Sequence, residues 1–325
     1  MSSAADLRIL VTGANGFVGP HLVDQVRRRF GDRTEFYLTS MVPAIHAQIG
    51  AIHELDVTNS PSVEAAVSEF APTHVVHLAG LAAITTANAN AQLAWDVHLF
   101  GTLNVANAIL KRAPDCVMLS VGSGQVYGAS ARTGQPLDEA TLLVPTNNYE
   151  VTKAAGDLGV GALTGQGLRS VRLRPFNHTG RGQSLDFVIP SLAMQIARIE
   201  AGLQPPSVKV GNLEAERDFM DVRDVTAAYS SVISNAAGIP PGTILNIASG
   251  IPRRIHDLLD RLLAMSRVPI AVEADPQRMR PSDTPRFVGD GSLARRLLDW
   301  SPQYTIDATL ADVLDDCRLR VSNAA

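Results

Sequence analysis

A short apolar strand followed by a glycine-rich turn and an amphipathic helix is the feature that most restricts the fold of this chain. The apolar stretch 8–12 leads directly into Gly13-Ala14-Asn15-Gly16-Phe17-Val18-Gly19, and a helical pattern then runs from Phe17 to Arg29. Gly13 allows a tight turn, Gly16 lets the backbone approach a pyrophosphate, and Gly19 lets the helix pack closely on the strand. The first N–H groups of the helix would then bind the anion. Because the spacing is G-x-x-G-x-x-G rather than G-x-G-x-x-G, an ordinary turn is the alternative interpretation.

Strands and helices alternate through the first half of the chain. Strands are expected at 8–12, 35–39, before Asp56, and at 74–79, 116–121 and 169–174, with helices near 17–29, 61–70, 91–112 and 149–164. This alternation predicts an α/β fold, because parallel strands must be joined by right-handed helical crossovers and form a doubly wound Rossmann sheet. After Arg174 the composition changes, and Pro, Gly and Arg become frequent. We predict a dinucleotide-binding domain of residues 1–175 plus about 222–250, and a smaller C-terminal α/β substrate-binding domain of 176–221 and about 251–325.

Composition excludes several classes of protein. Hydrophobic residues make up 46% of the 325 residues and charged residues 18%, which favours a globular enzyme over a disordered chain. The net charge is −4, with Arg27–Arg29 as the one basic cluster, so nucleic acid is not an expected partner. No apolar run reaches membrane-spanning length, and we therefore expect a cytoplasmic protein without a membrane partner. Cys116 and Cys317 lie far apart in apolar patterns and the histidines are scattered, so no metal site is expected.

A hydroxyl, a phenol and an ammonium group follow this nucleotide-binding pattern. Ser123 lies in Ser123-Gly124-Gln125-Val126-Tyr127-Gly128, and Tyr149 precedes Lys153 by four residues. Residues spaced i, i+4 share one face of a helix, so the ammonium of Lys153 should favour ionisation of Tyr149 and lower its pKa from about 10. This arrangement predicts a redox site in which a tyrosine exchanges a proton with substrate.

Taken together, these motifs resemble the extended short-chain dehydrogenase/reductase family, the NAD-dependent epimerase/dehydratase enzymes of nucleotide sugars, over nearly the whole chain. The resemblance implies Ser123, Tyr149 and Lys153 as catalytic residues. Tyr149 would protonate a carbonyl oxygen, Ser123 would hydrogen-bond that oxygen, and Lys153 would hold the cofactor ribose. It also implies a cofactor site formed by Gly13, Asn15, Gly16, Phe17, Val18, Gly19, Asp56, Val57, Leu78, Ala79, Gly80, Tyr149 and Lys153. Asp56 would bind the adenine amino group, although residues 56–60 could also be a strand end followed by a helix cap formed by Asp56, Thr58 or Ser60, and both can be true.

The C-terminal half resembles the GDP-sugar branch of this family, and within it the 4-keto reductases. The resemblance is carried by 174–183, 211–225 and 278–283. It implies NAD(P)H-dependent reduction of the 4-keto group of GDP-4-keto-6-deoxy-D-mannose to GDP-6-deoxy-D-mannose, also called GDP-D-rhamnose. The substrate residues would be Ser123, Gln125, Asn177, Arg181, Lys209, Arg217 and Arg280. Guanidinium groups suit a diphosphate, but each arginine alone could also form an ordinary surface ion pair.

Three positions depart from the family pattern, and one of them is Arg181, where a proline is expected. Dehydratases of this branch carry an acid two residues after the small hydroxyl residue, where this chain has Gln125, which cannot transfer a proton. Elimination of water is therefore disfavoured. His98 stands where the family usually has an asparagine that supports the catalytic lysine, and it could replace that role or fill space. The segment 81–90, rich in Ala and Thr, receives no assignment.

The cofactor preference follows from the expected second strand. An NAD-specific site needs a carboxylate at the end of this strand, and residues 37–41 contain none. The hydroxyls of Thr39 and Ser40 could instead accept a 2′-phosphate, so NADP(H) is favoured and NAD(H) remains possible.

Three other readings stay open. A GDP-mannose 4,6-dehydratase and a nucleotide-sugar 4-epimerase could use the same scaffold, and a non-catalytic NADP-sensing regulator is a further alternative. The helices 91–112 and 149–164 match those that form a four-helix homodimer interface in the family, although their apolar faces could be buried within one subunit. The configuration at C4 of the product, rhamno or talo, is also left open.

Overall fold

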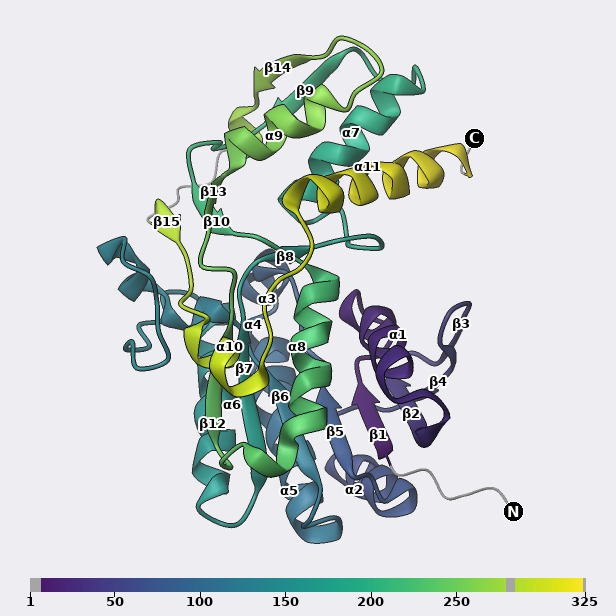
Figure 1. Cartoon of the computed structure of the whole chain (residues 1–325), viewed down its shortest axis with the longest axis vertical. Coiled ribbons are helices and arrows are strands. Elements are labelled where there is room, and N and C mark those ends of the chain that lie inside the picture. Colours follow the sequence, from purple (N-terminus) through teal and green to yellow (C-terminus); the bar gives the residue numbers. More distant parts are fainter. Residues whose placement is uncertain (1–6, 279–283, 324–325) are drawn as a thin grey trace.

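A mostly parallel sheet forms the larger part of the computed structural model, which describes residues 7–278 and 284–323. Within these ranges its eight strands are β1 (Leu7–Thr12), β2 (Thr34–Ser40), β3 (Ala44–His46), β4 (Gly50–Glu54), β5 (His74–His77), β6 (Val117–Val121), β7 (Arg169–Pro175) and β12 (Thr243–Ile247). They are ordered β12-β7-β6-β5-β1-β2-β4-β3 (Figure 1). Every pairing is parallel except that of the edge strand β3 with β4. The predicted doubly wound α/β sheet is therefore confirmed.

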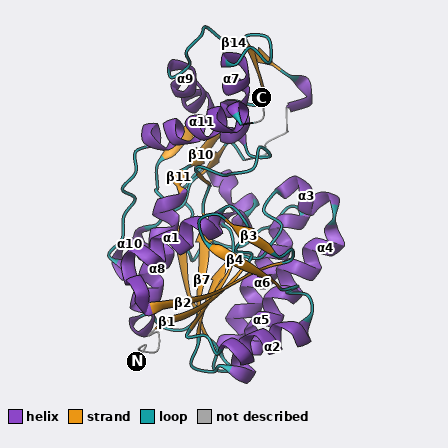
Figure 2. Cartoon of the chain, turned by 90° about the vertical axis from the view of Figure 1, so that its right-hand side faces the viewer, coloured by secondary structure: helices purple, strands orange, loops and turns teal. Residues whose placement is uncertain are grey.

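Helices cover both faces of this sheet, as the alternation along the sequence predicts. One face carries α1 (Val18–Phe30), α8 (Val222–Asn235) and α10 (Ser292–Leu298), and the other carries α2 (Ser60–Phe70), α5 (Thr102–Arg112) and α6 (Asn148–Thr164). Figure 2 shows the two sets on opposite sides of the strands. Successive residues of β1 serve the two layers, because Ile9 and Val11 pack with α1 and α8 whereas Leu10 packs with α2 and α5. A strand buried on both faces has to be apolar along its whole length.

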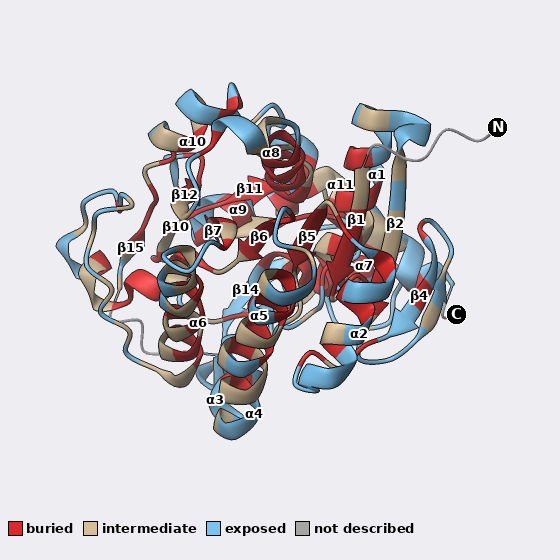
Figure 3. Cartoon of the chain, turned by 90° about the horizontal axis from the view of Figure 1, so that it is seen from below, coloured by how far each residue is buried: buried red, intermediate tan, exposed pale blue. Residues whose placement is uncertain are grey.

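A second group of elements has its own hydrophobic core. This group consists of α7 (Val188–Glu200), α9 (Ile255–Ala264), α11 (Ile306–Ser322), β9 (Ser207–Val210) and β14 (Ala271–Ala274). Between this group and the large sheet lie β8 (His178–Thr179) paired with β11 (Met220–Asp221), and β10 (Glu216–Asp218) paired with β13 (Pro252–Arg254) and β15 (Arg286–Phe287) (Figure 1). The domain boundaries that we infer from the sequence stay a prediction. Buried residues gather on the strands and on the helix sides that face them (Figure 3).

The predicted helix at 91–112 is interrupted. Its residues form α4 (Ala91–Trp95), a π-helical turn at Asp96–Gly101, and then α5. The segment 81–90, which the sequence left unassigned, contains the short helix α3 (Ile84–Ala89). A π-helical turn holds an extra residue and re-aims the side chains that follow, and such turns are frequent at functional sites.

The strand order reverses at β1, which lies between β5 and β2. At such a point the connections leave to opposite sides, and a crevice opens at the carboxyl ends of the strands. Among the described residues no helix is both long and apolar enough to cross a membrane.

Candidate active site

A cleft of about 990 Å³ opens at this carboxyl edge of the sheet. Its walls come from the segments that follow six parallel strands. They are Gly13 and Gly16–Val18 after β1, Ser40 and Met41 after β2, Leu55–Thr58 after β4, Leu78–Ala82 after β5, Gly122, Ser123 and Gln125 after β6, and Phe176–His178 after β7. Sites in doubly wound sheets lie at this edge, and the volume is at the upper end of ordinary ligand sites.

The glycine turn leaves room for an anionic ligand. Gly13 has φ +69°, and a Cβ at this position would lie 2.7 Å from the backbone nitrogen of Ala79, so another residue would be strained and would clash. A Cβ at Gly19 would lie 2.0 Å from the carbonyl oxygen of Ala14, which explains how helix and strand pack so closely. No described side chain caps the N-terminus of α1. Phe17, the residue that precedes this helix, lines the cleft. The first N–H groups of α1 are therefore suited to the pyrophosphate of a dinucleotide.

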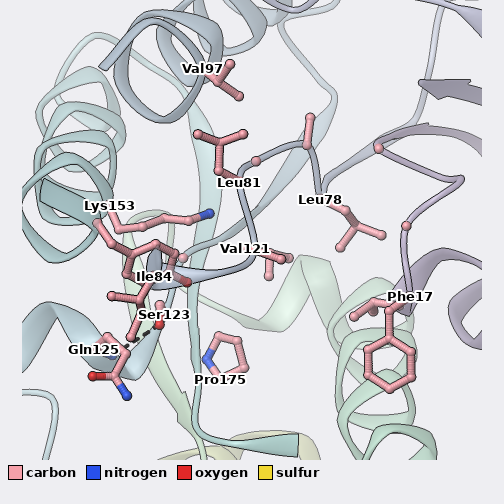
Figure 4. Close-up of a pocket in the computed structure, with 18 of the residues that line it drawn as sticks. Phe17, Leu78, Leu81, Ile84, Val97, Val121, Ser123, Gln125, Lys153 and Pro175 are labelled. Carbon is pink, nitrogen blue, oxygen red and sulfur yellow. Dashed lines mark hydrogen bonds between the residues drawn. The ribbon is translucent and has the colours of Figure 1, made fainter. Parts of the chain in front are cut away.

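Ser123, Tyr149 and Lys153 all line this cleft. Figure 4 shows Ser123, Gln125 and Lys153 at one end and Phe17 at the other, with Leu78 between them. Ser123 precedes a short 3-10 helix and accepts a hydrogen bond from the backbone nitrogen of Gln125 at 3.1 Å. The side chain of Ser123 also acts on Tyr149, whose pKa it lowers. The structure thus brings the three groups of the predicted redox site into one cavity.

The N-terminus of α6 is fixed by local hydrogen bonds. Asn147 caps the helix by accepting from the Glu150 nitrogen at 3.1 Å, and the Glu150 carboxylate accepts from the Thr146 nitrogen at 2.6 Å. Asn88 Oδ1 of α3 accepts from the Tyr149 nitrogen at 3.3 Å. This capping pattern orders the first turn of the helix, which carries Tyr149.

Burial dominates the electrostatics of the site. Burial raises the pKa of Tyr149, while its hydrogen bond with Ser123 acts in the opposite direction. The expectation that Lys153 lowers the pKa of Tyr149 is therefore wrong, because the phenol is more strongly affected by loss of solvent. Burial also lowers the pKa of Lys153 to about 8. A protonated tyrosine beside a lysine that still carries charge at neutral pH is suited to donating a proton.

Some of the residues predicted to bind the adenosine part of the cofactor line the cleft, and others do not. Asp56 and Val57 line the cleft, and Asp56 Oδ1 accepts from the nitrogen of Thr58 at 2.9 Å. The cap of the following helix α2 is Asn59, so the predicted helix cap is confirmed but its assignment to Asp56, Thr58 or Ser60 is wrong. Ser40 lines the cleft, but Thr39 is fully buried and donates to the carbonyl of Val11 at 3.1 Å. Thr39 as a phosphate contact is therefore wrong, because its hydroxyl is buried and already bonded to the neighbouring strand β1.

The predicted substrate residues are brought together only in part. Gln125 and Asn177 line the cleft, and Asn177 Oδ1 is buried without a hydrogen-bond partner. Arg181 is exposed, and its carbonyl accepts from His21 at 3.0 Å. Lys209 lies on the exposed side of β9 and pairs with Glu273. The structure thus contradicts Arg181 and Lys209 as parts of the cleft wall.

Of the two remaining predicted arginines, Arg217 lies within the described residues. Arg217 on β10 lies outside the cleft wall, and its guanidinium donates to the carbonyl of Glu216 at 2.7 Å. Its neighbour in the next strand, Phe287 of β15, lines the cleft, so Arg217 lies close behind the wall. Arg280 lies outside the described residues.

Sequence reasoning missed an apolar part of the wall. It consists of Leu81, Ala82, Ile84, Phe176, Phe187, Val188, Ile189, Phe219, Tyr229 and Phe287. These residues come from segments far apart in the chain, so no local spacing could identify them as a group. Within the described ranges, no cluster of His, Cys, Asp or Glu could hold a metal ion.

The sequence profile of the family described as GDP-mannose 4,6 dehydratase matches residues 10–313. Together with the Rossmann sheet and the Ser123, Tyr149 and Lys153 site, this match places the chain in the extended short-chain dehydrogenase/reductase family, among the NAD(P)-dependent oxidoreductases of nucleotide sugars.

Several individual proteins are similar to this chain over nearly its whole length. The chain is 34% identical to GDP-6-deoxy-D-mannose reductase of Pseudomonas aeruginosa over 97% of this chain and 98% of that protein. It is 26% identical to GDP-6-deoxy-D-talose 4-dehydrogenase of Aggregatibacter actinomycetemcomitans over 97% of this chain and all of that protein. Among solved structures, RMD from Pseudomonas aeruginosa complexed with NADPH superposes with a TM-score of 0.83 at 31% identity, covering 97% of this chain and 99% of that one. UDP-glucose 4-epimerase of Thermus thermophilus complexed with NAD shares the fold, with a TM-score of 0.81 at 23% identity over 96% of this chain and 99% of that one.

Proposed function

We propose that this enzyme reduces the 4-keto group of GDP-4-keto-6-deoxy-D-mannose to give GDP-6-deoxy-D-mannose. The observation that carries the proposal is a cavity that holds Ser123, Tyr149 and Lys153 together with Gln125 in place of the acid that elimination requires. The 34% identity to GDP-6-deoxy-D-mannose reductase over nearly the whole chain supports the same reaction.

The residues present fit a nicotinamide dinucleotide. The uncapped N-terminus of α1 and the turn at Gly13 and Gly16 suit the pyrophosphate, and Asp56 can accept from the adenine amino group. Lys153 is suited to the ribose hydroxyls. When bound, the cofactor supplies the hydride for the ketone carbon.

The side chains of this chain supply the proton and the orientation. Tyr149 donates its phenolic proton to the carbonyl oxygen, and its raised pKa keeps that proton in place until the transition state. Ser123 hydrogen-bonds the same oxygen as it gains charge. Asn177, whose Oδ1 is buried and unpaired, is suited to accept from a hydroxyl of the sugar.

We favour NADPH over NADH as the reductant. The described end of β2 offers Ser40 and no carboxylate to repel a 2′-phosphate, and the relative at TM-score 0.83 is complexed with NADPH. Comparison of the dissociation constants of NADPH and NADH by tyrosine and tryptophan fluorescence tests this preference. Tighter binding of NADH would overturn it.

The decisive experiment mixes the enzyme with GDP-4-keto-6-deoxy-D-mannose and NADPH and follows absorbance at 340 nm. NMR of the product sugar then assigns the configuration at C4. We expect NADPH oxidation and the manno configuration. A product with the talo configuration would instead show that the enzyme forms GDP-6-deoxy-D-talose, the sugar in the name of the 26% identical relative. The absence of NADPH oxidation would refute the reductase proposal.

Gln125→Glu tests why the enzyme is a reductase and not a dehydratase. The variant restores a carboxylate beside Ser123, and we expect slower ketone reduction without dehydration of GDP-mannose, since elimination also needs a matched sugar pose. Wild-type enzyme that already dehydrates GDP-mannose with added NADP⁺ would contradict the reductase proposal. Dehydration by the variant alone would show that Gln125 decides the reaction by itself.

We also propose a homodimer whose interface is formed by the helices within residues 91–112 and 149–164. Leu93, Phe100 and Leu158 are exposed apolar residues on these elements, and a face of this kind favours association. Light scattering after size exclusion should give twice the mass of one chain for the wild type and a monomer for Leu158→Glu. A monomeric wild type would contradict the proposal.

A further inference from the structure

His98 occupies the π-helical turn between α4 and α5 and is buried beside the site. Its Nε2 accepts a hydrogen bond from the backbone nitrogen of Leu81 at 2.9 Å. Its Nδ1 lies 2.9 Å from the hydroxyl of Thr152 on α6. The ring also meets Tyr149 edge-on, with centroids 5.6 Å apart and planes at 88°. One imidazole thus touches both the cleft loop after β5 and the helix that carries Tyr149 and Lys153.

The neighbouring donors determine the tautomer of this ring. Because the Leu81 N–H points at Nε2, that nitrogen must carry a lone pair, and the proton lies on Nδ1. The Thr152 hydroxyl donates to the Asn148 carbonyl at 2.7 Å, so its oxygen is free to accept from Nδ1. Both ring nitrogens are therefore occupied, and the ring holds two elements together without moving a proton.

A second buried histidine extends the network to the glycine turn. His77 Nε2 lies 3.0 Å from the Thr102 hydroxyl, which donates to the carbonyl of His98 at 2.7 Å. His77 Nδ1 lies 2.8 Å from the Thr12 hydroxyl, which accepts from the Ala79 nitrogen at 3.3 Å. The backbone of the loop Leu78–Leu81 is thus fixed at Ala79 by β1 and at Leu81 by His98.

The packing leaves little freedom around this loop. A Cβ at Gly80 would lie 3.0 Å from Lys153 Nζ and 3.3 Å from the ring of His98. A Cβ at Gly156 would lie 2.4 Å from the carbonyl oxygen of His98, so α6 approaches the π-helical turn backbone to backbone. A small displacement of the His98 ring must therefore move either the loop or the catalytic helix.

Building on the proposed function, we propose that His98 is a positioning residue whose two ring nitrogens have separable tasks. Nε2 holds the loop Leu78–Leu81 in the shape that receives the nicotinamide side of the cofactor. Nδ1 holds α6 so that Tyr149 and Lys153 face the reacting carbonyl.

The charged surroundings agree with a permanently neutral ring. Burial lowers the pKa of His98 to about 3, and the charge of Lys153 on α6 acts in the same direction. Protonation would direct an N–H of the ring at the N–H of Leu81.

Two substitutions separate the tasks. His98→Asn ends its amide at the position of Nδ1, so it can still donate to Thr152 but cannot reach Leu81. His98→Gln extends its amide to the position of Nε2, so it can still accept from Leu81 but leaves Thr152 without its partner. His256→Gln is the matched control, because His256 on α9 is exposed and does not line the cleft.

The readouts are the dissociation constant of NADPH, the single-turnover rate of hydride transfer, and amide hydrogen exchange by mass spectrometry. For His98→Asn we expect about tenfold weaker NADPH binding, faster exchange in the peptide covering Leu81, and a transfer rate within about threefold of wild type. For His98→Gln we expect unchanged NADPH affinity, faster exchange at the start of α6, and a transfer rate lowered about tenfold. The control should match wild type in all three.

Equal losses in both variants, or a uniform loss explained by a smaller folded fraction, would show a merely structural role and overturn the proposal. Wild-type values in both variants would also overturn it. NADPH affinity and hydrogen exchange do not depend on the sugar, so failure of the ketone to react would refute the proposed function while these two readouts still decide the role of His98.

Discussion

The two ends of the cleft differ in how completely the protein builds them. At the catalytic end Ser123 and Tyr149 are buried and Lys153 is half-buried, and α6 is capped by Asn147 and contacted by His98. At the sugar end two of the cations predicted to bind the substrate are engaged elsewhere, since Lys209 pairs with Glu273 and Arg217 donates to backbone carbonyls.

This difference follows from where the residues lie in the chain. The catalytic groups belong to one turn and one helix that both lie in the connection from β6 to its parallel neighbour β7, so local geometry and the sheet bring them together. The sugar end is assembled from short strands and loops of the second group of elements. Pre-organised groups contribute most to the transition state, whereas groups that must rearrange contribute mainly to binding. We therefore expect substitutions at the catalytic end to lower turnover and those at the sugar end to weaken substrate binding.

Tyr149→Phe should have the largest effect. The variant removes only the proton donor, so we expect kcat to fall about 10²- to 10⁴-fold while NADPH affinity stays nearly unchanged. Steady-state kinetics and fluorescence titration measure the two quantities. Turnover close to that of wild type would remove Tyr149 from its assigned role.

Arg217→Ala should act mainly on substrate binding. If the guanidinium turns to the diphosphate, its loss costs roughly 1.5–3 kcal/mol, and KM should rise by about 10- to 150-fold with a smaller change in kcat. NADPH affinity serves as the internal control and should hardly change. An unaltered KM in a folded variant would assign Arg217 to the structure around β10 alone.

The pH profile should report Lys153. Its pKa is lowered to about 8, so the charged form is lost as pH rises through 8, and kcat/KM should fall by about tenfold per pH unit above that value. Tyr149, whose pKa is raised, stays protonated in this range. Lys153→Arg keeps its charge at every accessible pH, so its profile should stay flat even if its rate is lower. A decline at the same pH in that variant would show that another group titrates.

Lys209→Ala should have the smallest effect and is the counterpart of Arg217→Ala. Lys209 is an exposed residue that pairs with Glu273 outside the cleft wall, and we expect KM and kcat within about twofold of wild type. A rise in KM as large as that of Arg217→Ala would mean that β9 moves to the cleft when the nucleotide sugar binds, and the contrast between the two ends would then be weaker.

The sequence by itself determined the features that depend on short-range geometry. The strand, glycine turn and helix at 8–29 define the anion site, because three residue types at fixed spacing allow the close approach of strand, turn and helix. The i, i+4 spacing puts Tyr149 and Lys153 on one face of α6. Alternation of strands and helices determined the doubly wound sheet, and with it the edge at which the site had to lie.

Only the tertiary structure decided which side chains reach that edge and with what pKa. The hydroxyl of Thr39 is buried and bonded to β1, and Arg181 is exposed beside His21, although both residues belong to segments that reach the right region. Burial, which depends on distant segments, raises the pKa of Tyr149 against the direction that its spacing from Lys153 suggests. The role of His98 also depends on partners at residues 81 and 152, 17 and 54 positions away in the chain. Spacing fixes neighbours within one element, whereas solvent exclusion and contacts between elements arise only when the whole chain has folded.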